Sequence, residues 1–233
     1  MTGHLTLVGV GPGDPDLITL KAVAAIQTAG LIAYPVTPSG RALARDIARP
    51  HLPESCVEWA FEVPMSVDPA PAQAAYDAAA GALATHLGAG QSVVVLCEGD
   101  PFFYGSAMYL HDRLVGRFPI TVVPGVTSLS AASAAAGRPL ARRDEVFVVA
   151  PATAGAERLD AAFAVADSVA VMKVGRHMAT VRDTLAAGGL NGNAVLAEKV
   201  GWPEQRIAPL GQADQEPGYF SLVLTRKSER EDA

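Results

Sequence analysis

The feature that most constrains the fold is the alternation of short apolar runs with helical patterns over the first 124 residues. The runs are "HLTLVGV" (4–10), "LIAY" (31–34), "SVVVLC" (92–97) and "ITVVPG" (120–125). The run "SVVVLC" is continuously apolar, which is typical of a strand buried on both faces. A repeated strand–helix order predicts a parallel sheet covered by helices.

The segments between these runs carry helix signals. Thr19 precedes the helical pattern "LKAVAAIQTA", and Gly30 is the expected C-cap. Pro35 is expected to stop the second strand, because proline cannot donate to a sheet ladder. Further helices are predicted from about Ser39 to Ala48, over the Ala-rich stretch 71–90 and over 106–116.

The second part of the chain has a different character. A basic connector, "RPLARRDE" (138–145), separates a small-residue helix from four further strands. The last strand, "YFSLVLTRK" (219–227), alternates in part, which indicates a mixed sheet. We therefore predict two α/β domains, residues 1–124 with a mostly parallel sheet and residues 125–233 with a mixed sheet. The expected strands begin near 146, 168, 193 and 219, and the expected helices lie near 156–166 and 177–187.

Composition excludes several classes of protein. Half of the 233 residues are apolar, but no stretch approaches the ~20 apolar residues of a membrane helix. No signal peptide is expected, and two cysteines without metal spacing fit a reducing cytoplasm. The net charge of −6 and the lack of a basic stripe argue against nucleic-acid binding. The five histidines are scattered, so no metal site is expected.

Two Gly-Asp-Pro triplets, ending in Pro15 and Pro101, each close a predicted strand. They are either ordinary turn chemistry or the two halves of one ligand site. The first loop fails as a dinucleotide fingerprint, because Asp14 replaces the third glycine and Pro12 removes an amide. Glycines and carboxylates without a phosphate loop suit S-adenosylmethionine, which has a ribose and an ammonium but no phosphate. By themselves, these residues predict only an acid-lined crevice at the carboxyl ends of strands.

Four segments resemble the tetrapyrrole (corrin/porphyrin) methylases: 7–22, 96–106, 122–132 and 171–177. The similarity runs from about residue 4 to residue 226. It implies methyl transfer from S-adenosylmethionine to a reduced tetrapyrrole, a cofactor held between two domains, and a homodimer. Within the family, Glu98, "AYP" and "MKVGRH" are most similar to members that methylate C20 of precorrin-2. Members acting on cobalt-factor II, on another corrin position, or only binding a tetrapyrrole or nucleoside stay as alternatives.

The resemblance also implies site residues. Several have structural alternatives: Met172 as core packing, Thr127 and Ser128 as helix caps, and the arginines of "RPLARRDE" as a solvated linker. No residue is nominated as the base that accepts the C20 proton. The implied cofactor contacts are Pro12, Glu98, Gly99, Asp100, Phe103, Thr127, Ser128, Met172, Val200 and Ser221. The cations expected for the carboxylates of precorrin-2 are Arg138, Arg142, Arg143, Lys173 and Arg176.

Overall fold

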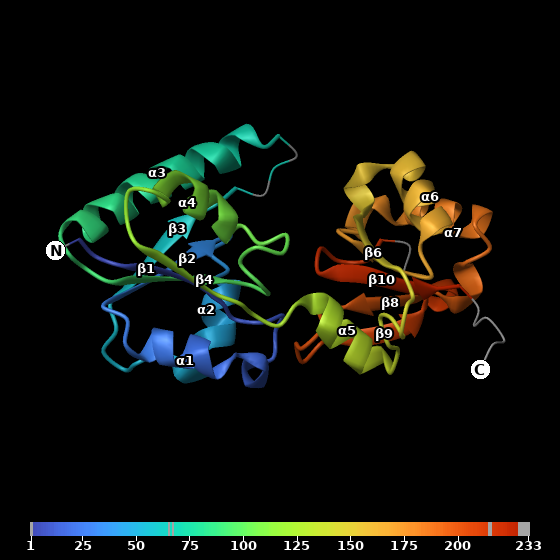
Figure 1. Cartoon of the computed structure of the whole chain (residues 1–233), viewed down its shortest axis with the longest axis horizontal. Helices are drawn as coiled ribbons and strands as arrows, with labels where there is room; N and C mark the ends of the chain where they lie inside the picture. Colours follow the sequence, from blue (N-terminus) through green and yellow to red (C-terminus); the bar gives the residue numbers. More distant parts are fainter. Residues whose placement is uncertain (1, 65, 67, 214–215, 228–233) are drawn as a thin grey trace. The chain divides into compact units, whose positions relative to one another are not determined.

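The computed structural model describes residues 2–64, 66, 68–213 and 216–227. The chain divides into two units, Met1–Thr127 and Ser128–Ala233 (Figure 1). Each unit has its own five-stranded sheet with helices against it. The predicted fold class, two α/β domains with a parallel and then a mixed sheet, is confirmed. Within the described residues, no helix combines the length and apolarity needed to span a bilayer.

The sheet of unit 1 is parallel throughout. Its strand order is β3-β2-β4-β1-β5, so β1 lies between β4 and β5. Because the strands run in one direction, their carboxyl ends share one edge, called here the carboxyl edge. Central β4 is buried along its whole length, as its unbroken apolar sequence predicts. The strands are β1 Leu5–Gly9, β2 Leu31–Val36, β3 Glu58–Glu62, β4 Val93–Cys97 and β5 Ile120–Val123.

Helices cover both faces of this sheet (Figure 1). On one face α3 (Ala70–Gly88) and α4 (Ala107–Leu114) pack together, and on the other lie α1 (Leu20–Gln27) and α2 (Leu43–Ala48). Leu83, Leu87, Leu110 and Leu114 are fully buried between α3, α4 and the strands. Each such leucine contributes about 1.5–3 kcal/mol of burial free energy, so this face anchors the sheet.

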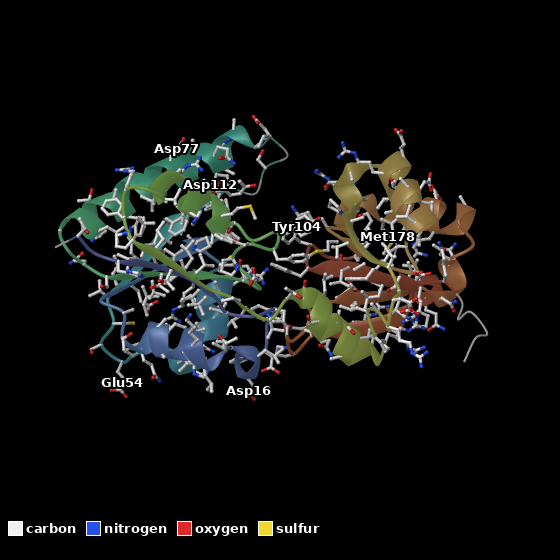
Figure 2. The ribbon with its side chains drawn as sticks, viewed as in Figure 1. Asp16, Glu54, Asp77, Tyr104, Asp112 and Met178 are labelled. Carbon is white, nitrogen blue, oxygen red and sulfur yellow. The ribbon has the colours of Figure 1, made fainter. Side chains whose placement is uncertain are left out.

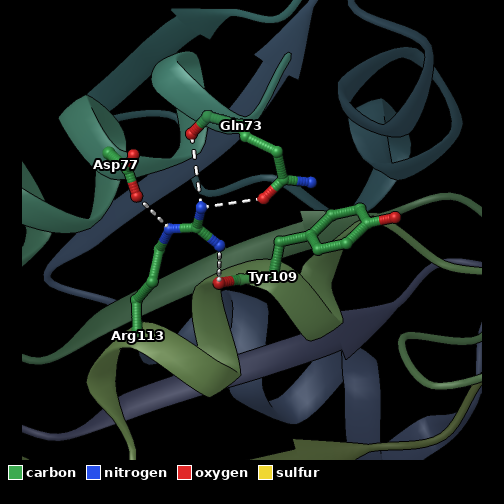
Figure 3. A network of polar contacts seen from close by, with 4 residues as sticks. All are labelled: Gln73, Asp77, Tyr109 and Arg113. Atoms are coloured by element: carbon green, nitrogen blue, oxygen red, sulfur yellow. Dashed lines mark hydrogen bonds and ion pairs between the residues drawn. The ribbon is translucent and has the colours of Figure 1, made fainter. Parts of the chain in front are cut away.

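Arg113 on α4 makes four hydrogen bonds, and three of them join this helix to α3 (Figure 3). Its Nε donates to Asp77 Oδ1 at 2.6 Å, and its Nη2 donates to both the backbone carbonyl oxygen and the side-chain oxygen of Gln73. Nη1 donates to the Tyr109 carbonyl at 2.9 Å. The planar guanidinium matches this spread of acceptors, which a lysine ammonium does not.

The sheet of unit 2 is mixed, with the order β6-β7-β10-β8-β9. Only β6 and β7 pair in parallel. Met178 at the start of α7 is buried in the core of this unit (Figure 2). The elements are β6 Phe147–Pro151, β7 Ser168–Met172, β8 Val195–Glu198, β9 Arg206–Pro209, β10 Ser221–Arg226, α5 Ser128–Ala136, α6 Ala156–Val165 and α7 Met178–Ala187.

The antiparallel course of β10 defines two opposite edges of this second sheet. Leu222 pairs with Met172 and Ser221 pairs with Glu198, so these ends lie together at what we call the Met172 edge. At the other end Arg226 pairs with Ser168, which gives the Ser168 edge. Four residue steps along β7, from Ser168 to Met172, separate the edges by about 13 Å at 3.3 Å per residue.

Short 3₁₀ turns connect several of these elements. They are η1 Pro15–Leu17, η2 Arg49–His51, η3 Ala152–Ala154, η4 Gly175–His177, η5 Asn191–Asn193 and η6 Leu210–Gln212.

Local expectations are partly corrected. Thr19 caps α1 as predicted, accepting from the Ala22 N–H at 3.2 Å. Gly30 is not the C-cap, because α1 ends at Gln27 and the Thr28 hydroxyl donates to the Ala24 carbonyl. Pro35 does not stop β2, which continues to Val36. Proline is tolerated there because pairing of β2 with β4 ends at Ala33, which frees one side of the strand.

The start of one helix and one short strand also differ from the sequence-based expectation. The helix expected from about residue 39 begins only at Leu43. Strand β9 was not predicted, since its four residues include only two aliphatic side chains. The chain divides after Thr127, and the predicted domain boundary near residue 124 stays a prediction.

Candidate functional site

Two Gly-Asp-Pro loops meet at the carboxyl edge of unit 1. The Gly99 N–H donates to the Gly11 carbonyl at 2.7 Å, and the Gly11 N–H donates to the Gly99 carbonyl at 3.3 Å. These bonds form a separate antiparallel bridge just beyond the ends of the parallel β1–β4 pair. The loops are therefore neighbours because β1 and β4 are neighbours, although about 90 residues separate them in sequence.

A third loop, after β5, packs directly on the other two. A Cβ added to Gly125 would lie 2.0 Å from the Gly99 carbonyl oxygen. A Cβ added to Gly9 would lie 2.6 Å from the same oxygen and from the Gly125 nitrogen. Only glycine lets three backbones approach this closely. The carboxyl edge is thus a cluster of backbone amides and carbonyls with no side chain between them at these positions.

The two aspartates explain why the same triplet occurs twice. Asp14 Oδ1 accepts from the Asp16 N–H at 2.9 Å, and Asp100 Oδ1 accepts from the Phe102 N–H at 2.9 Å. Each carboxylate thus closes the same local turn two residues ahead. Asp100 does more, because its Oδ2 accepts from the Gly125 N–H at 3.1 Å. It ties the second loop to the third.

Glu98 lies at the end of β4, with its carboxyl turned toward the start of α2. Burial raises the pKa of this carboxyl, and a hydrogen bond from the Ala44 backbone opposes the shift. Its neighbour Cys97 is fully buried, and burial raises the pKa of that thiol to about 12. Cys97 is therefore a small core residue, as expected, and Glu98 is a partly buried carboxyl with a raised pKa.

Open space adjoins the converged loops at Gly99. This residue has φ +65°, and a Cβ placed on it would meet nothing within 4 Å. Tyr104, further along the same loop, is a non-glycine residue at φ +54° with an exposed ring (Figure 2). Its ring meets the half-buried Phe103 edge-on at 5.2 Å. Such backbone strain concentrates at functional sites, so this loop is a candidate ligand contact.

In unit 2, the Met172 edge gathers three residues predicted for the cofactor. Met172 is half-buried at the end of β7, and buried Ser221 begins the adjacent β10. The Ser221 hydroxyl donates to the Gly218 carbonyl at 2.7 Å and accepts from the Gly175 N–H at 3.4 Å. Val200 follows β8 and is 6% exposed, which fits core packing.

Two lysines at this edge have strained backbones. Lys173 follows Met172 with φ +56°, and Lys199 follows β8 with φ +45°. Together with Tyr104, they are three of the four non-glycine residues with positive φ in the described part of the chain. All three lie in loops that follow the carboxyl ends of strands, where α/β proteins bind ligands.

The five cations predicted for substrate carboxylates fall into two groups. Lys173 and Arg176 follow β7 and lie at the Met172 edge. Arg138 and Arg142 line a pocket at the Ser168 edge, and Arg143 is exposed next to them in sequence. Two predicted cofactor contacts follow β5 along the chain: Thr127 ends unit 1, and Ser128 begins α5. None of the described residues forms a cluster of three potential metal ligands.

Sequence reasoning did not single out several residues that shape these edges. Gly9 and Gly125 control the approach of the loops, while Tyr104 and Lys199 carry the strained backbone. The available signal was a glycine at or just after three strand ends, Gly9, Gly99 and Gly125.

Comparison with known proteins decides the family. The family model described as Tetrapyrrole (Corrin/Porphyrin) Methylases matches residues 4–214. The chain belongs to this family. The tetrapyrrole-methylase resemblance predicted from four sequence segments is thereby confirmed.

Several tetrapyrrole methylases are similar over almost the whole chain. A precorrin-2 C(20)-methyltransferase of Sinorhizobium is 40% identical over 95% of this chain and 94% of its own length. A cobalt-precorrin-2 C(20)-methyltransferase of Salmonella typhimurium is 32% identical, over 97% and 98%. The cobalamin biosynthesis protein CobIJ of Mycobacterium bovis is 42% identical over 95% of this chain. The chain spans only 46% of that longer relative.

The fold is also that of solved tetrapyrrole methylases. A uroporphyrin-III C-methyltransferase from Thermus thermophilus, crystallised with S-adenosylhomocysteine, superposes with a TM-score of 0.70 at 25% identity. The match covers 97% of this chain and 98% of that one.

Proposed function

We propose that this tetrapyrrole methylase transfers a methyl group from S-adenosylmethionine to C20 of precorrin-2, giving precorrin-3A in cobalamin biosynthesis. The observation that carries the proposal is the 40% identity with the Sinorhizobium precorrin-2 C(20)-methyltransferase along nearly the full length of both chains. The Salmonella relative, named for the cobalt form of the substrate, is 32% identical over a similar span. The higher identity favours the metal-free acceptor.

The carboxyl edge of unit 1 fits the proposed methyl donor. It offers bare backbone around Gly99 with open space beside it, and the half-buried Pro12 in place of one amide. The Asp100 carboxylate already accepts two backbone N–H groups and adds negative charge. Such an edge suits a phosphate-free nucleoside with a positive sulfonium better than a pyrophosphate. The S-adenosylhomocysteine bound to the Thermus relative supports the same ligand class.

S-adenosylmethionine supplies an electrophilic methyl group whose leaving group departs as a neutral thioether. The residues of this chain therefore need no acid to assist departure, and their work is positioning and exclusion of water. We propose that Gly99, Asp100 and Pro12 fix the nucleoside by close backbone contact, with Glu98 and Phe103 beside them. The proposed contacts further along the chain are Thr127, Ser128, Met172, Val200 and Ser221.

The acceptor carries a fringe of carboxylates, which need cations. Lys173 and Arg176 are proposed for this role because both follow Met172 at the same edge of unit 2. Arg138, Arg142 and Arg143 stay a prediction for the same carboxylates. No side chain is assigned to accept the proton that leaves C20.

Labelled product identifies the reaction. The protein is incubated with methyl-labelled S-adenosylmethionine and metal-free precorrin-2, and the isolated product is analysed by NMR and mass spectrometry. One label at C20 is the expected result. Label on a different carbon, transfer only to uroporphyrinogen III, or tight nucleoside binding without transfer would each contradict the proposal.

The metal state, assembly and location each have a direct measurement. Initial rates on metal-free and cobalt-loaded acceptors are compared, and the metal-free form is expected to react faster. The homodimer and the cytoplasmic location are carried over from the family resemblance as proposals. Light scattering at micromolar concentration tests the first, and cell fractionation tests the second.

A further inference from the structure

A pocket of about 400 Å³ lies at the Ser168 edge of unit 2. It is remote from Met172, since the length of β7 separates them by about 13 Å. Four cationic side chains line it, and none of the described lining residues is acidic: Arg138, Arg142, Arg226 and Lys227. A volume of this size is sufficient for a small organic ligand.

Backbone carbonyls hold three of the cations in place. Arg138 Nη1 donates to the Asn193 carbonyl at 2.5 Å, and Lys227 Nζ donates to the Ala164 carbonyl at 3.1 Å. These bonds orient the side chains but leave their positive charge in place, because a carbonyl is neutral. The basic character of the pocket therefore survives its own internal contacts.

Arg226 alone of these three is paired with an acid. Its Nη2 bonds Glu145, while its Nη1 donates to the Pro139 carbonyl at 3.1 Å. The Arg142 backbone N–H also donates to Glu145, at 2.6 Å. Glu145 thus organises the connector that carries Arg138 and Arg142, and it is the acid that pairs with Arg226.

A serine adds a neutral polar group to the pocket. Ser168 lines the pocket and is 5% exposed. Its hydroxyl can donate one hydrogen bond and accept two. Leu140 and Leu224 give the same pocket an apolar wall.

We propose that this pocket binds the carboxylate groups of an organic anion. Arginine forks match the geometry of carboxylates, and the Ser168 hydroxyl can donate to the same oxygens. The apolar wall favours a carbon skeleton over a bare inorganic ion. The carboxylates come either from the rim of the tetrapyrrole, which rests on the proposed function, or from a free polycarboxylate, which does not.

Citrate is the probe, because it carries three carboxylates and needs no assumption about the methyl acceptor. Its affinity for the full chain is measured by calorimetry at low salt. Arg138→Gln with Arg142→Gln is expected to weaken citrate binding by about tenfold or more, because each change removes a charged donor to a carboxylate. The control, Arg41→Gln with Arg158→Gln, removes the same charge from exposed sites outside the pocket.

The outcomes separate clearly. Equal citrate affinity in the wild type, pocket variant and control, or no citrate binding at all, overturns the proposal. If the double variant does not fold, Lys227→Gln at the exposed end of β10 gives the same test, with a several-fold loss expected. Affinity for S-adenosylmethionine must stay unchanged throughout.

The source of the carboxylates is read from the kinetics of the pocket variant. A higher KM for the tetrapyrrole with unchanged kcat assigns the pocket to the acceptor's rim. Loss of citrate binding with an unchanged KM assigns it to a free polycarboxylate. Either result supports the pocket, and failure of methyl transfer in the wild-type protein would refute the proposed function without affecting the citrate result.

Discussion

Replacing Gly125 by alanine tests whether three backbones converge as described. The added Cβ would lie 2.0 Å from the Gly99 carbonyl oxygen, and 2.9 Å from two backbone atoms of Gly9. Ordinary contact begins near 3.4 Å, so the loops must separate by about 1.4 Å. None of the atoms concerned is the flexible end of a side chain. The Asp100–Gly125 hydrogen bond at 3.1 Å would be strained or lost as well.

The expected cost is about 2–3 kcal/mol, the upper part of the range for overpacking. For a unit of 127 residues with an unfolding entropy of about 2.1 cal/mol/K per residue, that lowers the melting temperature of unit 1 by roughly 7–11 °C. Scanning calorimetry on the full chain measures it, because the two units can unfold separately. The shifted loops should also lower kcat/KM by about 100-fold, as expected for a misplacement of about 1 Å.

Two matched substitutions complete the test. Gly9→Ala brings contacts of 2.6 Å rather than 2.0 Å, so a smaller loss is expected. Gly81→Ala, in the exposed part of α3 with nothing within 4 Å of the new Cβ, should stabilise the protein by about 0.5–1 kcal/mol. If Gly125→Ala melts with the wild type and keeps its activity, the convergence of the loops is wrong.

Three other predictions follow from the same structure. The pKa of Glu98 is raised in the folded state, so the wild type loses stability when this carboxyl ionises as pH rises. Glu98→Gln does not ionise, so its stability relative to the wild type should increase from pH 4 to pH 8. Melting curves that keep a constant difference across this range would contradict the prediction. Cys97 should resist a thiol reagent at pH 8 in the native protein while half-buried Cys56 reacts, and mass spectrometry showing equal labelling would refute the assigned burial. Arg113→Ala should destabilise unit 1 by about 1–2 kcal/mol, and Arg113→Lys by nearly as much. Asp77→Asn should cost less than about 1 kcal/mol, because the Asp77 carboxylate is largely exposed. Full stability of the lysine variant would show that charge alone matters.

The fold was predictable because its signals are local and strong. The apolar run of β4 and the alanine-rich sequence of α3 each suffice to identify one element. The ends of strands and helices were predicted less accurately, because they depend on which elements lie next to them in the fold. Pro35 looks like a strand breaker, yet it is accommodated because β4 stops accompanying β2 at Ala33. Four-residue β9 gave too short a pattern to recognise.

The candidate site was predictable in outline but not in its central contacts. The aspartates of the two triplets were visible, but their partners were not: Asp100 reaches Gly125 only because β5 pairs on the far side of β1. Likewise, the five predicted cations come from two segments of the chain and were predicted for the same substrate carboxylates. The antiparallel return of β10 shows that Arg138 and Lys173 belong to opposite edges of one sheet.

The choice between turn chemistry and a ligand site, left open by the sequence, is resolved in part by the geometry of the triplets. Asp14 and Asp100 both close local turns, so the repetition of Gly-Asp-Pro needs no ligand to explain it. The bonds between Gly11 and Gly99, however, are not required by either turn, and they bring two loops together at a carboxyl edge. A site built in this way uses main-chain groups for contact and side chains for tying loops. Its tolerance to mutation should therefore be lowest at glycines, where a methyl group moves backbone, and higher at polar residues, where water can replace a lost contact.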